Sequence, residues 1–190
     1  AVDLQPRFAE ALNNLSGFYT TKGLVDEAVQ VLQRAVDARP DYQIGFDNLL
    51  FLLNYHPERS AEAIYRVYQR FDERFGQPLR ATWRPHGNSR TLGRRLRVGY
   101  VSPDFRSHAC MFFLQPLIEH HDHQQVEVYA YAEQRDPDDA VTQRYQGAVD
   151  HWVPTRGLSD EALAERIRAD GIDILVDLAG HTKGNRPGVF

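Results

Sequence analysis

Two segments of the sequence carry side chains that could do chemistry. Residues 102–110 include Asp104, Arg106 and His108, and residues 180–186 read Gly-His-Thr-Lys-Gly-Asn-Arg. A neutral imidazole can accept or donate a proton near pH 7. Exposed amides, a hydroxyl and cations in a glycine-rich loop could hold a phosphate or a sugar. On the pattern alone, residues 180–186 could equally be an ordinary polar connection between a strand and a helix. His108 could likewise be a surface histidine.

The common nucleotide-binding motifs are absent from both segments. No G-x-G-x-x-G follows the apolar run at 96–101, and no G-x-x-x-x-G-K-[ST] occurs anywhere. This disfavours an ordinary dinucleotide enzyme and a P-loop NTPase, because their glycines are needed for close approach to the phosphates. An unrelated Rossmann-like enzyme therefore becomes a weaker hypothesis.

Three histidines near residue 120 suggest a metal site at first sight. His120, His121 and His123 flank Asp122 at the end of a predicted helix. Neighbouring positions on a helix point in different directions, so a solvated helix end is favoured and no metal site is predicted. The single cysteine, Cys110, excludes a metal cluster of the cysteine type and an intrachain disulfide.

Alternating strands and helices are expected to position the two polar segments. Apolar runs predict strands at 96–101, 126–132, 150–153 and 172–178, and the intervening patterns predict helices at 111–121, 138–147 and from Ser159 or Asp160 to Gly171. This alternation implies a Rossmann-like parallel sheet covered on both faces. Such sheets bind ligands beyond the carboxyl ends of their strands, where both polar segments lie.

The first 79 residues instead have the period of tetratricopeptide repeats. Pro6 and Pro40 are 34 positions apart, and a looser second copy places Asn48 34 positions after Asn14. Small residues such as Gly17 are expected to let paired helices approach closely. The second copy is degenerate, and an ordinary helical hairpin would look similar.

An arginine-rich stretch separates the two patterns. Residues 80–97 contain six arginines and no acidic residue, together with proline, glycine and serine. A phosphate-binding or nucleic-acid arm is conceivable, but the composition favours a linker with solvated arginines. We therefore divide the chain into repeats at 1–79, a linker at 80–95 and a sheet region at 96–190.

Composition and charge narrow the class of protein. The 190 residues are 42% hydrophobic and carry a net charge of -4, which gives no general attraction to nucleic acid. No apolar run approaches the length of a membrane-spanning helix, and polar residues from Asp3 to Arg7 interrupt the start too early for a signal peptide. With a single cysteine, a cytoplasmic location is expected.

Four runs in order along the chain resemble the SPINDLY-like and O-GlcNAc transferase family, glycosyltransferase family 41. They are residues 48–57, 96–108, 126–131 and 170–186. The resemblance implies a GT-B architecture of two Rossmann-like lobes, with the donor nucleotide bound chiefly by the second lobe and no metal or other cofactor. It also implies transfer of N-acetylglucosamine from UDP-GlcNAc to serine or threonine of proteins, although plant relatives of the SPINDLY type use GDP-fucose.

The resemblance assigns His108 to the active-site histidine, as a base or as a hydrogen-bonder that shapes the pocket. Thr182 falls on a residue of the sugar-donor pocket, which extends to the other residues of its loop: His181, Lys183 and Asn185. Two departures bear on acceptor and donor preference: Ala109 stands where the animal enzyme has proline, and His181 replaces its tyrosine.

The asparagines of the repeats have an implied role as well. In the resembling transferases, asparagines at the positions of Asn14 and Asn48 line the inner surface and bind the acceptor backbone. An amide suits this task because it both donates and accepts hydrogen bonds. The alternative is that they are polar residues of the helix surface or of the contact between helices.

The sequence is expected to be a fragment, because Phe190 falls inside the first lobe. Alone it should transfer no sugar and bind UDP weakly. The rival hypothesis is a non-catalytic tetratricopeptide module that binds proteins, and an O-fucosyl or O-glucosyl transferase of the same family is a further alternative. The sequence does not indicate an oligomeric state.

Overall fold

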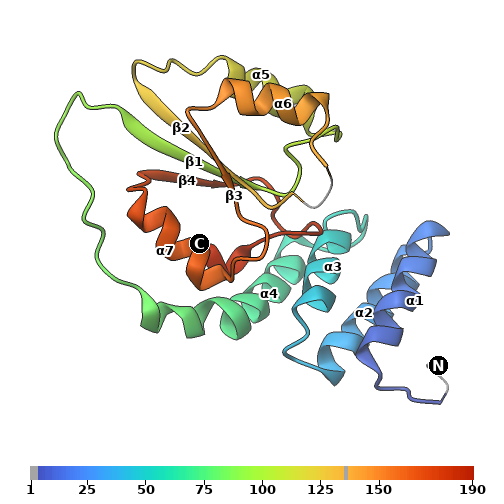
Figure 1. Cartoon of the computed structure of the whole chain (residues 1–190). Coiled ribbons are helices and arrows are strands. Elements are labelled where there is room, and N and C mark those ends of the chain that lie inside the picture. The colour runs from blue at the N-terminus through green and yellow to red at the C-terminus, as the bar shows by residue number, and fades with distance from the viewer. Residues whose placement is uncertain (1–3, 135–136) are drawn as a thin grey trace. The chain divides into compact units, whose positions relative to one another are not determined.

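The computed structural model describes residues 4–134 and 137–190 and divides the chain into two compact units, Ala1–Trp83 and Arg84–Phe190 (Figure 1). Within these described ranges, no helix is both long and apolar enough to cross a membrane. Each unit has its own apolar clusters. We describe the two units separately.

The first unit is helical throughout, as the repeat pattern predicts. Its elements are α1 (Ala9–Thr21), α2 (Val25–Ala38), α3 (Gln43–Leu53), α4 (Ala61–Phe71), a π-helix at Asp72–Gly76 and a 3-10 helix at Gln77–Thr82. Gly23 takes a φ of 73° in the turn between α1 and α2, a conformation that favours glycine. The side chain of Ser60 caps α4 by accepting from the Ala63 amide.

Apolar residues three and four positions apart form the core of this unit. Ala28, Leu32, Leu49 and other residues of α2 and α3 are fully buried. The expectation for Gly17 is wrong, because it is exposed and a Cβ atom there would meet nothing within 4 Å. At Gly45, a Cβ atom would lie 2.6 Å from the ring of Tyr42, the residue that precedes α3, and 3.4 Å from Val36 of α2.

The second unit is a four-stranded parallel sheet with helices between its strands. The elements are β1 (Leu96–Ser102), α5 (Met111–Glu119), β2 (Val126–Ala132), α6 (Ala140–Ala148), β3 (His151–Pro154), α7 (Asp160–Ala169), β4 (Ile174–Asp177) and a 3-10 helix at Pro187–Val189. The strand order is β3-β2-β1-β4. The predicted Rossmann-like arrangement is confirmed, although β4 is shorter than expected.

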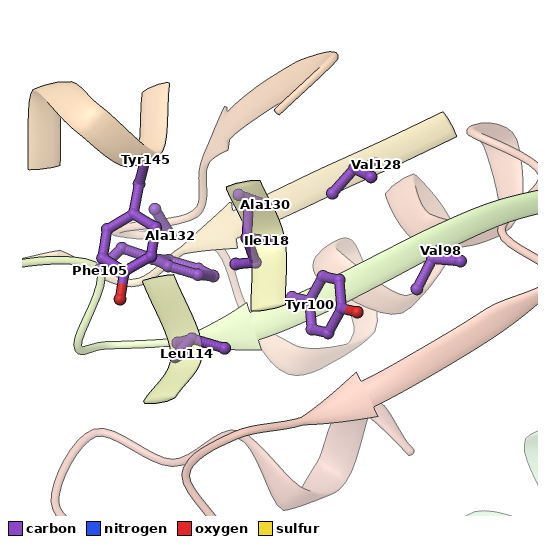
Figure 2. Packing of buried hydrophobic residues seen from close by; sticks show 9 residues of the cluster. All are labelled: Val98, Tyr100, Phe105, Leu114, Ile118, Val128, Ala130, Ala132 and Tyr145. Atoms are coloured by element: carbon purple, nitrogen blue, oxygen red, sulfur yellow. The ribbon is translucent and has the colours of Figure 1, made fainter. Parts of the chain in front are cut away.

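Helices cover both faces of this sheet, with α5 and α6 on one face and α7 on the other (Figure 1). Figure 2 shows the first core, in which Ile118 of α5 and Tyr145 of α6 pack in one cluster with Tyr100 of β1 and Phe105. On the other face, Tyr131 and Leu163 are fully buried. Burial of each large apolar side chain stabilises the fold by about 1.5–3 kcal/mol. The two cores therefore hold in place the strand ends from which the polar loops emerge.

From Arg84 onwards, the arginine-rich stretch is part of the second unit. Both Arg94 Nη atoms lie 2.6 Å from the Asp173 carboxylate, and Asn88 donates to Asp173 and to the carbonyls of Gly171 and Ile172. The exposed fraction of the side chain is only 28% for Arg94 and 9% for Asp173. The expectation of solvated arginines is therefore wrong for Arg94, which helps fasten residues 88–94 along the edge of the sheet unit.

Asp173 should make stability depend on acid pH. Hydrogen bonds from Arg94, followed by those from the Arg97 amide and Asn88, outweigh desolvation and hold the pKa of its carboxyl well below the usual range. A carboxyl whose pKa is lower in the folded than in the unfolded state stabilises the protein fully above about pH 4. This stabilisation is lost as the pH falls towards the pKa of the folded state. We expect Asp173→Asn to lower the free energy of unfolding by about 2 kcal/mol at neutral pH.

Urea denaturation followed by tryptophan fluorescence at several pH values checks this expectation. The difference between wild type and Asp173→Asn should shrink as the pH falls below about 4. Asp138→Asn is the matched control, because Asp138 is exposed and hydrogen-bonds only with Gln146 in the described part of the chain. A difference that stays constant down to about pH 2 would contradict the assignment.

Candidate functional site

The two polar segments meet at the carboxyl edge of the sheet. Strands β1 and β4 are neighbours, so the loops that leave them emerge side by side. Gly184 has a φ of 89°, and a Cβ atom there would lie 2.9 Å from the Pro103 Cβ. The backbone of the second loop therefore packs directly on the first, and only glycine fits this position.

The loop after β1 is anchored at two residues that alternate with its polar side chains. Phe105 is fully buried, with its ring 5.3 Å from Tyr145 and 5.6 Å from Trp152. Further along, the Ser107 amide donates to Asp139 Oδ2 over 2.7 Å. Asp139 also caps α6, and these amide hydrogen bonds lower the pKa of its carboxyl. The loop is thus fixed immediately before His108.

His108 presents one edge of its ring to the loop and is partly exposed. Its Nδ1 lies 3.4 Å from the Cys110 amide and 3.9 Å from Asp104 Oδ2, and 37% of its side chain is exposed. Asp104 is also bonded to Arg106. His108 Nε2 has no hydrogen-bond partner in the described ranges of the chain.

This geometry links the tautomer of His108 to its chemistry. If Nδ1 carries the proton and faces Asp104, Nε2 has a free lone pair and can act as a base. If Nδ1 accepts from the Cys110 amide, a neutral ring carries its proton on Nε2 and can only donate there. The Cys110 amide is within hydrogen-bond distance of Nδ1 and is consistent with the second arrangement, whereas Asp104 lies beyond that distance and acts on the ring only through its charge.

The glycine-rich loop after β4 is organised by its own polar groups. Asp177 accepts from the amides of Ala179 and Gly180. The Thr182 hydroxyl donates to the Ala179 carbonyl over 2.7 Å, and the Asn185 amide donates to the Gly180 carbonyl over 2.8 Å. Two of the four predicted donor-pocket residues therefore also shape the loop.

The other two donor-pocket residues lie in the same turn. Lys183 is exposed, and His181 is partly buried. Thr182 is exposed as well, and its oxygen keeps acceptor capacity beyond the hydrogen bond that it donates. The loop thus offers a cation, a hydroxyl oxygen and an imidazole within a short stretch beside the His108 loop.

Arg186 is not the exposed cation that the sequence suggests. Its side chain is 10% exposed, and it binds Glu133 Oε2 at 2.7 Å, Asp160 Oδ1 at 2.5 Å and the Leu158 carbonyl at 2.8 Å. Glu133 is equally buried and also accepts from the Thr155 hydroxyl. This network ties the glycine-rich loop to the ends of β2 and β3, and only the position of Glu133 at the end of a buried strand could have indicated it.

The three histidines near residue 120 go to different partners. His120 Nδ1 bonds to the Pro116 carbonyl, His121 Nε2 to the Tyr100 hydroxyl and His123 Nδ1 to Asp150. Burial lowers the pKa of His121, and neighbouring His123 adds to the effect. Among the described residues, no three His, Cys, Asp or Glu side chains are grouped as metal ligands.

The asparagines of the helical unit are on its surface. Asn14 on α1 and Asn48 on α3 are both exposed. Asn48 Nδ2 donates to Asn13 Oδ1 over 2.8 Å, a contact between α1 and α3 of the kind that the alternative interpretation expected. The structure thus leaves Asn14 available to a ligand and gives Asn48 a structural contact as well.

Comparison with known proteins places these features in a family. The model described as "Glycosyl transferase family 41" matches residues 79–190. A probable UDP-N-acetylglucosamine–peptide N-acetylglucosaminyltransferase SPINDLY of Oryza sativa subsp. japonica is 31% identical over 168 residues, which cover 85% of this chain and 18% of the relative. The UDP-N-acetylglucosamine–peptide N-acetylglucosaminyltransferase of Caenorhabditis elegans is 33% identical over 138 residues, 71% of this chain and 12% of the relative.

A solved structure is similar as well. The K341M mutant of Thermobaculum terrenum O-GlcNAc transferase matches with a TM-score of 0.89 and 34% identity, covering 99% of this chain and 36% of that one. The fold is thus consistent with the first lobe of a GT-B enzyme preceded by helices. The chain spans less than a fifth of the two curated relatives named above and about a third of the solved structure.

Proposed function

Because the chain belongs to glycosyltransferase family 41, we propose that it is part of an enzyme that transfers N-acetylglucosamine from UDP-N-acetylglucosamine to serine or threonine of proteins. The observation that supports this most directly is the packing of Gly184 on Pro103, which brings the loop of His108 beside the glycine-rich loop within the matched region. A proton-transferring side chain and a polar, cationic loop at one sheet edge suit transfer from a phosphate-linked sugar.

In the proposed reaction, an acceptor hydroxyl displaces the nucleoside diphosphate from the anomeric carbon with inversion. His108 Nε2 takes the hydroxyl proton or orients the hydroxyl, with Nδ1 facing the Cys110 amide and Asp104. Thr182, Lys183, His181 and Asn185 line the donor side, where the Lys183 ammonium would attract the diphosphate. The proposal requires no metal and places the reaction in the cytoplasm.

The donor sugar is the part of this proposal that needs a direct test. The full-length parent protein is incubated with a protein acceptor and UDP-GlcNAc, UDP-glucose or GDP-fucose in turn, and the product is analysed by mass spectrometry. A mass gain of one N-acetylhexosamine with UDP-GlcNAc alone is expected. A deoxyhexose gain with GDP-fucose would replace the proposed donor, and no gain with any donor would favour a non-catalytic binding module.

We expect residues 1–190 alone to transfer no sugar and to bind UDP weakly. The support is that the chain covers only 36% of the similar transferase structure, so groups beyond it would be needed to hold the nucleotide. Calorimetric titration of the chain with UDP and an activity assay check this expectation. Tight stoichiometric binding or measurable transfer would overturn it.

The exposed asparagines are proposed to bind the acceptor backbone. Replacing both Asn14 and Asn48 by alanine in the full-length parent should raise KM for a protein acceptor about 5- to 50-fold, the scale of one or two lost hydrogen bonds. The affinity for the nucleotide should not change. Steady-state kinetics with varied acceptor and donor measure both quantities.

Asn13→Ala is the matched control for that experiment. It removes the partner of Asn48 but leaves both predicted ligands in place. If Asn13→Ala raises KM as much as the double replacement does, the asparagines act through the contact between α1 and α3. Unchanged kinetics in a folded double variant would exclude both roles.

A further inference from the structure

The helical unit contains a groove of about 400 Å³ between α2 and α4. Val29 of α2, Leu53 of α3 and Val67 of α4 are buried or partly buried and give it an aliphatic lining. Gln30, Gln33 and Arg34 contribute from the α2 side, and Arg59 and Ala63 contribute from the α4 side. Its volume is within the range of ligand pockets and is large enough for a few side chains.

The two arginines of the groove differ in their pairing from three other arginines of this unit. Arg39 pairs with Glu10, Arg70 with Asp37 and Arg80 with Asp72. In contrast, neither Arg34 nor Arg59 has a carboxylate within ion-pair distance in residues 4–83. Within the same residues, Arg34 makes one long hydrogen bond of 3.4 Å, to the Pro6 carbonyl. Both cations are therefore available to an incoming anion.

The lining of the groove favours an acidic peptide over a nucleic acid as the anionic ligand. Partly exposed Val67 lies with the buried side chains of Val29 and Leu53 in an aliphatic floor, and none of the described residues that line the groove is an aromatic residue on which a base could stack. A peptide can instead place an aliphatic side chain on this surface and carboxylates on the arginines. Gln33 donates to Asp37, which leaves its carbonyl oxygen to accept from a peptide amide.

We propose that this groove binds an acidic peptide segment of a partner protein, with one aliphatic side chain over Val29, Leu53 and Val67 and carboxylates on Arg34 and Arg59. Most of the groove belongs to α2 and α4, whereas Asn14 and Asn48 lie on α1 and α3. It is therefore a second surface, and its occupant is distinct from the acceptor segment proposed for the asparagines.

Fluorescence polarisation with the 190-residue chain tests the proposal. The probes are fluorescein-labelled peptides Glu-Asp-Leu-Asp-Glu, the same peptide with serine for leucine, and Lys-Lys-Leu-Lys-Lys. The first probe should bind more tightly than the other two, and its affinity should fall between about 50 mM and 500 mM salt because the arginines remain partly solvated. Arg34→Glu combined with Arg59→Glu should weaken it at least about 10-fold through charge reversal.

Arg66→Glu is the matched control, because Arg66 is an exposed residue of α4 that does not line the groove. It should change the affinity less than about twofold, since rim charges outside a contact contribute little. Methyl resonances of Val29, Leu53 and Val67 should shift on titration of wild type. Equal weakening by Arg66→Glu, equal binding of the basic or serine peptide, or no binding by the folded wild type would overturn the proposal.

Discussion

Replacing His108 by alanine in the full-length parent should lower kcat/KM for a protein acceptor by about 10²- to 10⁴-fold, the usual contribution of a general acid or base. The structural reason is that His108 Nε2 points away from the partners of Nδ1, at the sheet edge where the glycine-rich loop approaches. The side chain is partly exposed, so the fold should survive. Activity and melting temperature are measured on the same preparation.

Two further variants separate catalysis from structure. Asp104→Asn should lower the rate less than His108→Ala, because it removes a carboxylate 3.9 Å from Nδ1 but leaves the imidazole in place. His86→Ala changes an exposed histidine of residues 84–95 and should leave both readouts unchanged. Near-normal turnover of His108→Ala would remove His108 from the mechanism.

The sequence predicted the strands that lead to the site but not the contacts that hold it. The runs at 96–101 and 126–132 match β1 and β2 closely, because buried parallel strands are nearly continuous apolar segments. Ser159 and Gly171 mark the ends of α7 through a side-chain cap and a φ of 65°. These signals lie within a few residues of the element that they mark, so they can be interpreted without knowing the tertiary contacts.

The two misjudged arginines depend on partners far along the chain. Arg94 binds Asp173 and Arg186 binds Glu133, and no pattern within a few residues identifies either partner. Gly17 was misjudged for a different reason, because the repeat pattern does not show which of its small residues faces the neighbouring helix. Periodicity shows which face of an element is apolar, but not which polar side chain another element will place beside it.

Replacing Arg186 by methionine should destabilise the sheet unit by about 3 kcal/mol, because it leaves the buried carboxylate of Glu133 without its cation. Methionine preserves much of the side-chain volume, so the loss reports charge and hydrogen bonding rather than a cavity. For a unit of this size, the melting temperature should fall by about 10–20 °C. Thermal and urea denaturation of the 190-residue chain measure both effects.

Lys183→Met is the matched control, since Lys183 is a cation of the same loop that is exposed, and it should change stability by less than about 0.5 kcal/mol. Adding Glu133→Gln to Arg186→Met should recover part of the loss, because the unpaired charge is then removed. Amide exchange of residues 180–185 should accelerate in Arg186→Met. Equal stability of the Arg186 and Lys183 variants would show that the glycine-rich loop is held without this ion pair, by Asp177 and the packing of Gly184 on Pro103.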